Sequence, residues 1–276
     1  MMATERQDAG RMVALQTPPT AELGGDLLLT SARRRAWTLG RPLLLTVAFF
    51  WLATQGWWVL ALATFPFLFL SQVVALNDVI HRSIGLGPAA TETALTLLGL
   101  LVVESGHLLQ VTHLAHHRQG GGSDDPESYV DLLPMRRLLP ELPLYRFRIW
   151  TYGWRHGRRC DRTWAAFEIA GTAAIAAVAV GGWTPSALRV FVVLSIVGGW
   201  AFPFVSAMGP HADWGRDHTA HCHRVKGRLL PMLMLDVPFH LEHHLYPDVP
   251  SHRLAELSRM LAPLLDDADI KEVRVW

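Results

Sequence analysis

The sequence is poor in cysteine and in charge. Its 276 residues include two cysteines, Cys160 and Cys222, which form neither a CxxC pair nor a disulfide scaffold. An iron–sulfur cluster needs about four thiolates, so the chain cannot hold one of its own. Charged residues make up 18% of the chain, against about 25% in an ordinary soluble domain. The net charge of +1 gives no electrostatic case for a nucleic-acid partner.

Long apolar runs take the place of charge. Half of the residues are hydrophobic, and no charged residue occurs from Pro42 to Asn77. As one helix this run would be about 54 Å long, nearly twice the roughly 30 Å of bilayer hydrocarbon. We therefore expect four spans, at about 42–57, 59–80, 165–182 and 187–210. The predicted fold class is an all-α polytopic membrane protein, with four transmembrane helices in two hairpins and a cytoplasmic helical cap that carries the histidine motifs described below.

The polar segments predict an orientation. Residues 1–40 are polar and lack the apolar core of a signal peptide, which predicts a partly disordered arm before a membrane domain at 41–276. Arginines flank the inner ends of all four spans, so the positive-inside bias places both termini in the cytoplasm. We expect a multi-pass protein of a bacterial plasma membrane. The stretch from Glu92 to Leu109 is too interrupted to span and predicts one interfacial helix.

Histidine is the residue that carries the chemistry. The motifs HLAHH and HLEHHLYP supply two triplets, His113, His116 and His117, and His240, His243 and His244. On a helix, rings at i, i+3 and i+4 share a face, whereas adjacent rings diverge by about 100° and suit two different ions. Neutral imidazole binds iron, zinc, copper or nickel. Six histidines without cysteine favour a dinuclear redox or hydrolytic centre over a structural zinc site.

These motifs resemble the histidine boxes of the membrane fatty-acid desaturase and hydroxylase family. HLAHH matches the second box and is followed by Asp124-Asp125-Pro126, and HLEHHLYP matches the third and is followed by VPSHRL at 249–254. The first box, normally HxxxH, is NDVIH at 77–81. The family has a di-iron centre, and it supplies a further histidine after the fourth span. The resemblance therefore implies two Fe ions held by His81, His113, His116, His117, His211, His240, His243 and His244.

The first box departs from the family pattern, because Asn77 replaces its first histidine. We expect the Asn77 amide oxygen to be a weak or water-mediated ligand. His107 is the alternative ligand, and otherwise an interfacial histidine. Among the crowded histidines at 218–223, His221 is a further candidate.

Carboxylates near the boxes are candidates for orienting the ligands. A carboxylate that accepts the free N–H of a ligating imidazole fixes its tautomer. Asp78 and Asp236 are placed for this role, although Asp236 could instead cap the helix of the third box. Glu242 lies on the opposite face from the ligands and is expected to be solvated.

The resemblance also implies an activity. We expect an enzyme that uses O2 to desaturate an acyl chain carried by a lipid, coenzyme A or a carrier protein. Its electrons would come from a separate donor, such as ferredoxin with its NAD(P)H reductase. Three alternatives remain: a hydroxylase or ketolase acting on a fatty, carotenoid or specialised-metabolite substrate, a metal transporter, and an inactive metal-binding relative. Transport would require ionisable residues within the spans, which almost lack them.

Overall fold

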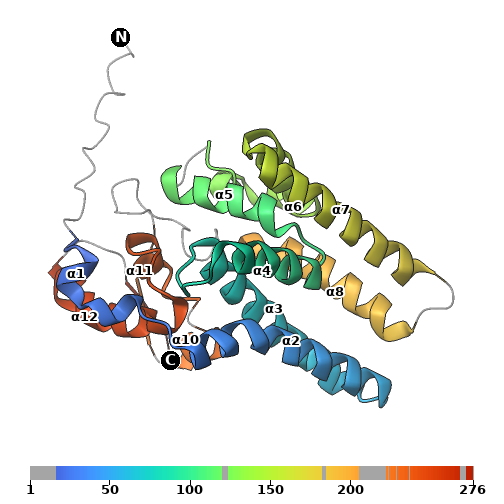
Figure 1. The fold of residues 1–276 in the computed structure, drawn as a ribbon, viewed down its shortest axis with the longest axis horizontal. Coiled ribbons are helices and arrows are strands. Elements are labelled where there is room, and N and C mark those ends of the chain that lie inside the picture. Colours follow the sequence, from blue (N-terminus) through green and yellow to red (C-terminus); the bar gives the residue numbers. More distant parts are fainter. Residues whose placement is uncertain are drawn as a thin grey trace, which may run out of the picture.

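The computed structural model describes residues 17–119, 124–181, 185–204, 222, 224–227, 229–235, 237–267 and 272–275, mostly as helices (Figure 1). In chain order the elements are α1 (Thr20–Leu23), the 3-10 helix η1 (Gly25–Leu28), α2 (Ala32–Thr54), α3 (Trp58–Ile80), α4 (Pro88–Leu101), α5 (Gly106–Gln119), η2 (Ser128–Leu132), α6 (Met135–His156), α7 (Arg159–Val180), α8 (Ser186–Pro203), β1 (Arg224–Lys226), α10 (Leu229–Leu233), α11 (His240–Leu245), η5 (Ser251–Arg253), α12 (Leu254–Asp267) and β2 (Glu272–Arg274). Strands β1 and β2 pair in parallel. The expected all-α class missed this small sheet, since strands of three residues leave no readable alternation.

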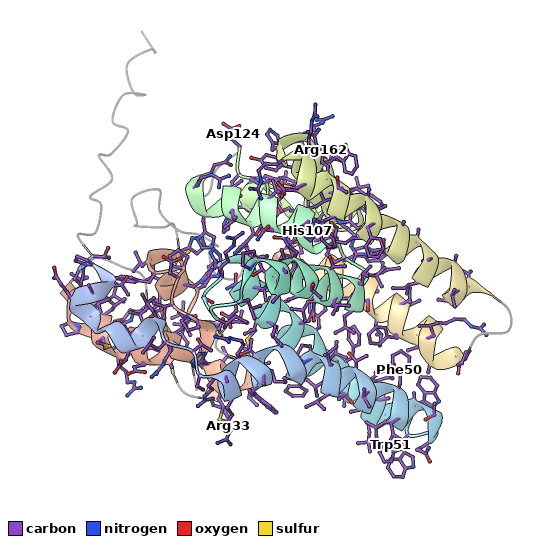
Figure 2. All side chains as sticks on the ribbon, in the orientation of Figure 1. Arg33, Phe50, Trp51, His107, Asp124 and Arg162 are labelled. Atoms are coloured by element: carbon purple, nitrogen blue, oxygen red, sulfur yellow. The ribbon has the colours of Figure 1, made fainter. Side chains whose placement is uncertain are left out.

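Within the described residues, four helical segments are each long and apolar enough to cross a membrane. They are Asp26–Thr54, α3, α7 and α8. Large apolar side chains are exposed on them, including Val47 at 67%, Val59 at 81% and Phe167 at 61%. Extended exposed apolar surface of this kind marks contact with lipid. Figure 2 shows aromatic Phe50 and Trp51 toward one end of α2 and Arg33 at the other. The chain is an integral membrane protein.

Two helices begin well before the apolar runs that predicted them, α2 at Ala32 instead of 42 and α7 at Arg159 instead of 165. α2 begins at Ala32, where the Ser31 side chain accepts a hydrogen bond from the backbone N–H of Arg34 at 3.2 Å. Hydropathy marks the apolar part of a span and not its helical continuation among charged residues. The predicted boundary of the arm at residue 40 therefore falls inside α2. The described part of the arm is packed, since the Tyr246 hydroxyl donates to the Pro18 carbonyl at 2.6 Å.

The single interfacial helix predicted from Glu92 to Leu109 is wrong. The chain forms α4 and α5 instead, bent by 103° with respect to each other. Val103 lies between them in the left-handed region, at φ 60°. Gly106 allows the two backbones to touch, because a Cβ there would lie 2.2 Å from the carbonyl oxygen of Leu95. Periodicity could not reveal this bend, since the apolar pattern continues through it.

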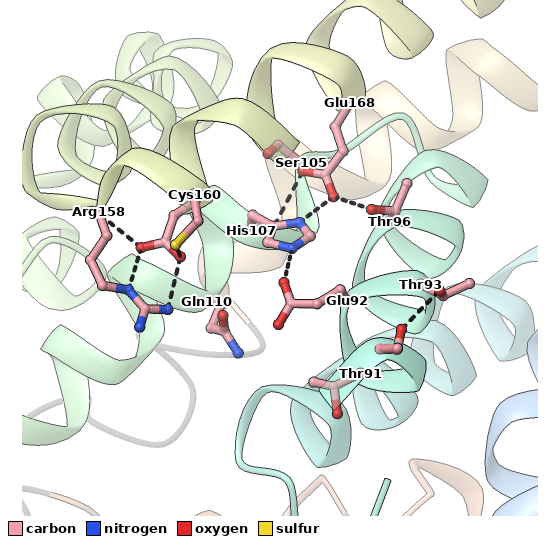
Figure 3. A network of polar contacts seen from close by, with 12 residues as sticks. Thr91, Glu92, Thr93, Thr96, Ser105, His107, Gln110, Arg158, Cys160 and Glu168 are labelled. Atoms are coloured by element: carbon pink, nitrogen blue, oxygen red, sulfur yellow. Dashed lines mark hydrogen bonds and ion pairs between the residues drawn. The ribbon is translucent and has the colours of Figure 1, made fainter. Parts of the chain in front are cut away.

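A buried polar network fixes the bend (Figure 3). Glu168 of α7 accepts hydrogen bonds from the hydroxyls of Thr96 at 3.0 Å and Ser105 at 2.6 Å. The His107 ring lies between two carboxylates, with Nδ1 2.6 Å from Glu168 and Nε2 2.8 Å from Glu92. Both ring nitrogens of His107 are thus engaged and the residue is fully buried. His107 is neither an interfacial histidine nor a substitute ligand, but links a membrane-spanning helix to α4 and α5.

The C-terminal elements form their own apolar core. Figure 1 shows α11 and α12 at the side of the molecule away from the C-terminal end of α7. This core includes Leu241, Leu257, Leu261 and Leu265, with Leu27 from the N-terminal segment. Glu242 is fully buried, 4.0 Å from Arg224 of β1, so its expected solvation is wrong. Burial raises the pKa of Glu242. Its cationic neighbour comes from a distant strand, which the local helical pattern could not show.

Candidate metal centre

Three elements bring histidines together at one place. His81 caps the C-terminal end of α3, α5 carries the triplet of the second box, and α11 carries the triplet of the third. Their ring nitrogens form two sets, in each of which the atoms lie within 4.8 Å of one another. The first histidine group consists of His81, His113, His117 and His243. The second histidine group consists of His116, His240 and His244.

The first histidine group is closely packed. Nε2 of His117 lies 3.2 Å from Nε2 of His113 and 3.0 Å from Nε2 of His243. The His81 ring stands edge-on to the His117 ring, with centroids 4.5 Å apart. Nε2 of His81 is buried and has no hydrogen-bond partner among the described residues. Leaving a buried polar atom unsatisfied costs about 1–3 kcal/mol, so a ligand for this nitrogen would stabilise the fold.

The second histidine group lies beside the first. Nε2 of His244 is 3.2 Å from Nε2 of His116 and 3.0 Å from Nε2 of His240. The rings of His117 and His244 stack at 4.2 Å and join the two groups. Residues adjacent in the sequence belong to different groups, His116 apart from His117 and His243 apart from His244. A helix requires this, because consecutive side chains point about 100° apart.

Two carboxylates orient the imidazoles of α5, one for each group. Oδ2 of Asp125 accepts a hydrogen bond from Nδ1 of His116 at 2.7 Å, and Oε2 of Glu127 accepts one from Nδ1 of His113 at 3.1 Å. With the proton on Nδ1, the Nε2 lone pair is available to a metal. Sequence reasoning missed both residues as orienting groups. A signal for this segment was present in the sequence, the Asp-Pro feature that follows the second box, but it served only as part of the family resemblance.

Burial keeps several of these imidazoles neutral. Desolvation, and then the neighbouring imidazoles, lower the pKa of His81 and of His117, and lower the pKa of His243 to about 3. Burial alone would raise the pKa of Asp125, but hydrogen bonds from His116 and from backbone N–H groups lower it to about 2. Neutral imidazoles beside the ionised Asp125 are the protonation states that bind a divalent metal.

The donor set fits metal ions in both groups. Two imidazole nitrogens bound at about 2.1 Å to one ion lie about 3.0 Å apart at a right angle, and about 3.4 Å apart at the tetrahedral angle. The Nε2 separations of 3.0 and 3.2 Å in each group fall in this range. Imidazole donors suit iron, zinc, copper and nickel. Both groups consist of histidine alone.

An apolar cavity of about 120 Å³ adjoins both groups. Its wall includes His113 and His243 of the first group and His240 of the second. Most of the remaining wall is apolar, with side chains such as Leu76 of α3 and Ile149 of α6. An apolar chain in this cavity would therefore lie against histidines of both groups at once.

The remaining predicted residues have different positions. Asn77 lines the cavity one helical turn before His81. Asp78 is buried but bonds away from the histidines: its Oδ1 accepts the backbone N–H and the hydroxyl of Ser251, both at 2.8 Å, and the hydroxyl of Ser83 at 3.1 Å. Asp78 thus ties α3 to the segment after the third box instead of orienting a described imidazole. Three predicted residues lie outside the described part of the chain: His211, His221 and Asp236.

Sequence comparison matches a known protein family over most of the chain. No curated protein matches the chain. The sequence model of the family described as Fatty acid desaturase matches residues 77–276, which include both histidine groups. The match covers well over half of the chain, and it confirms the resemblance carried by the histidine boxes. The chain belongs to the fatty acid desaturase family.

Proposed function

We propose that the chain is an oxidoreductase that uses O2 and two iron ions to desaturate an acyl chain in the membrane. The observation that carries this proposal is the apolar cavity whose wall contains histidines of both groups. Such a wall would hold an unactivated C–H bond beside two metal sites. The acyl group would be carried by a lipid, by coenzyme A or by a carrier protein.

The two histidine groups are the proposed ligand sets, one for each iron. Asn77 is proposed as a weak or water-mediated ligand, His211 as a further ligand of the centre, and His221 as an additional candidate. Bound iron would supply the activation of O2 that attack on a C–H bond requires. Asp125 and Glu127 hold protons on Nδ1 of their imidazoles, so the Nε2 lone pairs remain available.

The balance of the reaction requires external electrons. Desaturation takes two hydrogens from the chain and, with O2, two electrons and two protons, gives an alkene and two waters. Hydroxylation consumes the same reductant and gives an alcohol and one water. We propose ferredoxin with its NAD(P)H reductase, or a similar donor, as the source. The histidine groups and both termini are proposed to face the cytoplasm of a bacterial cell, in line with the arginines that flank the spans.

Expression in a host with tractable lipids, followed by mass spectrometry of lipids and metabolites, tests this function. A product lighter by two hydrogens supports desaturation, whereas a product heavier by one oxygen supports the hydroxylase alternative. His117→Ala should abolish product, because it removes an imidazole at the junction of the two groups. His156→Gln is the matched control, since His156 is exposed and bonds the Tyr152 carbonyl of its own helix.

Metal analysis separates the enzyme from an inactive relative. Purified chain with about two irons and a lipid product supports the proposal. Chain without iron, and without product in the presence of a ferredoxin system, would contradict it. Chain with iron but no product from any host lipid would place the substrate outside the membrane lipids.

A further inference from the structure

The cavity has a second polar region besides its histidine wall. Gln72 of α3, Glu104 between α4 and α5, and Arg146 of α6 all line it. None of the three belongs to a histidine group or contacts one of the carboxylates that orient the ligands. An apolar chain alone gives no reason for three polar side chains at this point of the wall.

Gln72 offers an unused hydrogen-bond acceptor. The side chain is 1% exposed, and its Nε2 donates to the carbonyl of Leu98. Its Oε1 has no hydrogen-bond partner within the part of the chain that the structure describes. Buried side-chain polar atoms are nearly always paired, so an unpaired acceptor on a cavity wall points to a donor supplied by the cavity's occupant.

Arg146 and Glu104 add a neutral ion pair to the same wall. Nε of Arg146 lies 2.9 Å from Oε2 of Glu104, and Glu104 also accepts the indole N–H of Trp150. Nη2 of Arg146 donates to the Ser195 carbonyl at 3.4 Å. The guanidinium lies over Gly199, where a Cβ would come within 2.5 Å of Nη2. The glycine thus leaves the space that the charged side chain occupies.

The polar region lies at a distance from the metal sites. Gln72 precedes Asn77 by five residues and His81 by nine on the same helix, which corresponds to about 7 to 14 Å along the helix axis. Phe69, one turn before Gln72, and Gly199, under Arg146, also line the cavity, and a Cβ on the neighbouring Gly198 would lie 2.7 Å from the Phe69 ring. Phe69 and Gly199 thus connect Gln72 and Arg146 along one stretch of the cavity wall.

We propose that this region recognises a hydroxyl group on the apolar chain of the substrate. The assignment rests on the proposed function and names its substrate class: a chain that already carries a neutral O–H group. A hydroxyl can donate to Oε1 of Gln72 and accept from the Arg146 guanidinium, which a plain hydrocarbon cannot do. A carboxylate fits less well, because Glu104 already balances the charge of Arg146. At about 1.25 Å of rise for each C–C bond, the separation corresponds to about six to eleven bonds between hydroxyl and reacting carbon.

A competition experiment on the purified full-length chain in lipid nanodiscs tests the proposal. Octadecanoic acid and a hydroxyoctadecanoic acid are offered in equal amounts, and native mass spectrometry gives the ratio of the two bound probes. The hydroxyl is moved along the chain in a series. We expect about tenfold preference for the hydroxylated probe at one or two adjacent positions. A ratio near one at every position would overturn the proposal without need of any variant.

Variants locate the effect. Gln72→Met keeps the length of the side chain but removes the acceptor. The preference for the hydroxylated probe over octadecanoic acid should then fall to about twofold or less. Leu68→Met places the same new residue one turn earlier on α3, in the apolar core and away from the cavity wall, and should leave the preference intact. An unchanged preference in Gln72→Met would overturn the role of Gln72. A stronger preference for octadecanedioic acid, with its second carboxylate, would overturn the assignment to a neutral group.

These outcomes are separate from the test of the proposed function. Iron content and lipid products report on the histidine groups, whereas the ratio of bound probes reports on the cavity wall. If the chain holds iron and gives an oxidised product but shows no preference for any hydroxylated probe, the proposed function is supported and the hydroxyl-recognition proposal is contradicted.

Discussion

Replacing Asp125 with asparagine should weaken metal binding in the second histidine group alone. Oδ2 of Asp125 accepts from Nδ1 of His116 at 2.7 Å, while Oδ1 accepts the backbone N–H groups of Glu127 and Ser128 at 2.8 and 3.0 Å. An amide has one oxygen and cannot serve both sets of donors. If that oxygen keeps the backbone donors, the amide NH2 faces Nδ1, and the imidazole proton moves to Nε2. There it blocks the lone pair that would bind metal.

The expected magnitude follows from the role of the carboxylate. Removing a carboxylate that orients a metal-binding imidazole lowers metal affinity by about 10- to 100-fold, or about 1.4 to 2.7 kcal/mol. Asp125 is fully buried, so water cannot easily take its place beside His116. We therefore expect the upper part of this range.

Chelator titration of the iron-loaded chain measures the effect. In Asp125→Asn, one iron should be released at about 100-fold higher free iron than in the wild type, and the other should be unchanged. Glu127→Gln should loosen the other iron, and the double variant should loosen both. Asp161→Asn is the matched control. Asp161 is a buried carboxylate on α7 that, like Asp125, accepts a backbone N–H, here that of Arg158 at 2.7 Å. Equal weakening of both irons in Asp125→Asn, or an unchanged titration, would refute the tautomer argument.

Three further predictions concern stability. Removal of metal should lower the Tm by about 8 to 16 °C, since an ion at a thousand times its Kd stabilises the fold by about 4.1 kcal/mol. Gly106→Ala should destabilise by at least about 1–3 kcal/mol, because its Cβ would meet the Leu95 carbonyl, whereas Gly40→Ala has open space. Burial alone would lower the pKa of His107, but Glu168 and then Glu92 raise it above its ordinary value of 6.5. The stability that protonated His107 contributes to the fold is therefore complete below pH 6.5, and it is lost as the pH rises through the raised pKa.

Thermal unfolding of the purified chain in detergent checks these three. An unchanged Tm after chelation would show that the histidine groups hold no metal in the folded chain. Equal stability of the Gly106→Ala and Gly40→Ala variants would contradict the close contact of α4 and α5. His107→Gln should flatten the alkaline fall in Tm that the wild type shows above pH 6.5. A wild-type Tm that rises through this range would contradict the buried pairing of His107 with its carboxylates.

Local periodicity predicted a good part of this molecule. The HxxHH spacing predicted that adjacent imidazoles would point to different places, and His116 and His117 do lie in different groups. Apolar runs located the four candidate spans of the described chain, because a span must be apolar throughout its length. Both inferences depend only on residues within one helix.

The features that sequence reasoning missed depend on distant partners. Glu242 is buried because Arg224 of another element lies beside it. His107 lies in the core because Glu168, on a spanning helix, accepts its N–H groups. Asp78 bonds Ser251, far along the chain, and none of the imidazoles that the structure describes. No local pattern reveals contacts of this kind, since each is fixed by how the helices pack.

Diffraction from crystals of the purified chain at the iron absorption edge would locate the metal directly. Two anomalous peaks are expected, one bounded by the Nε2 atoms of His113, His117 and His243, the other by those of His116, His240 and His244. A single peak, or peaks away from these nitrogens, would contradict a two-iron centre held by the two histidine groups.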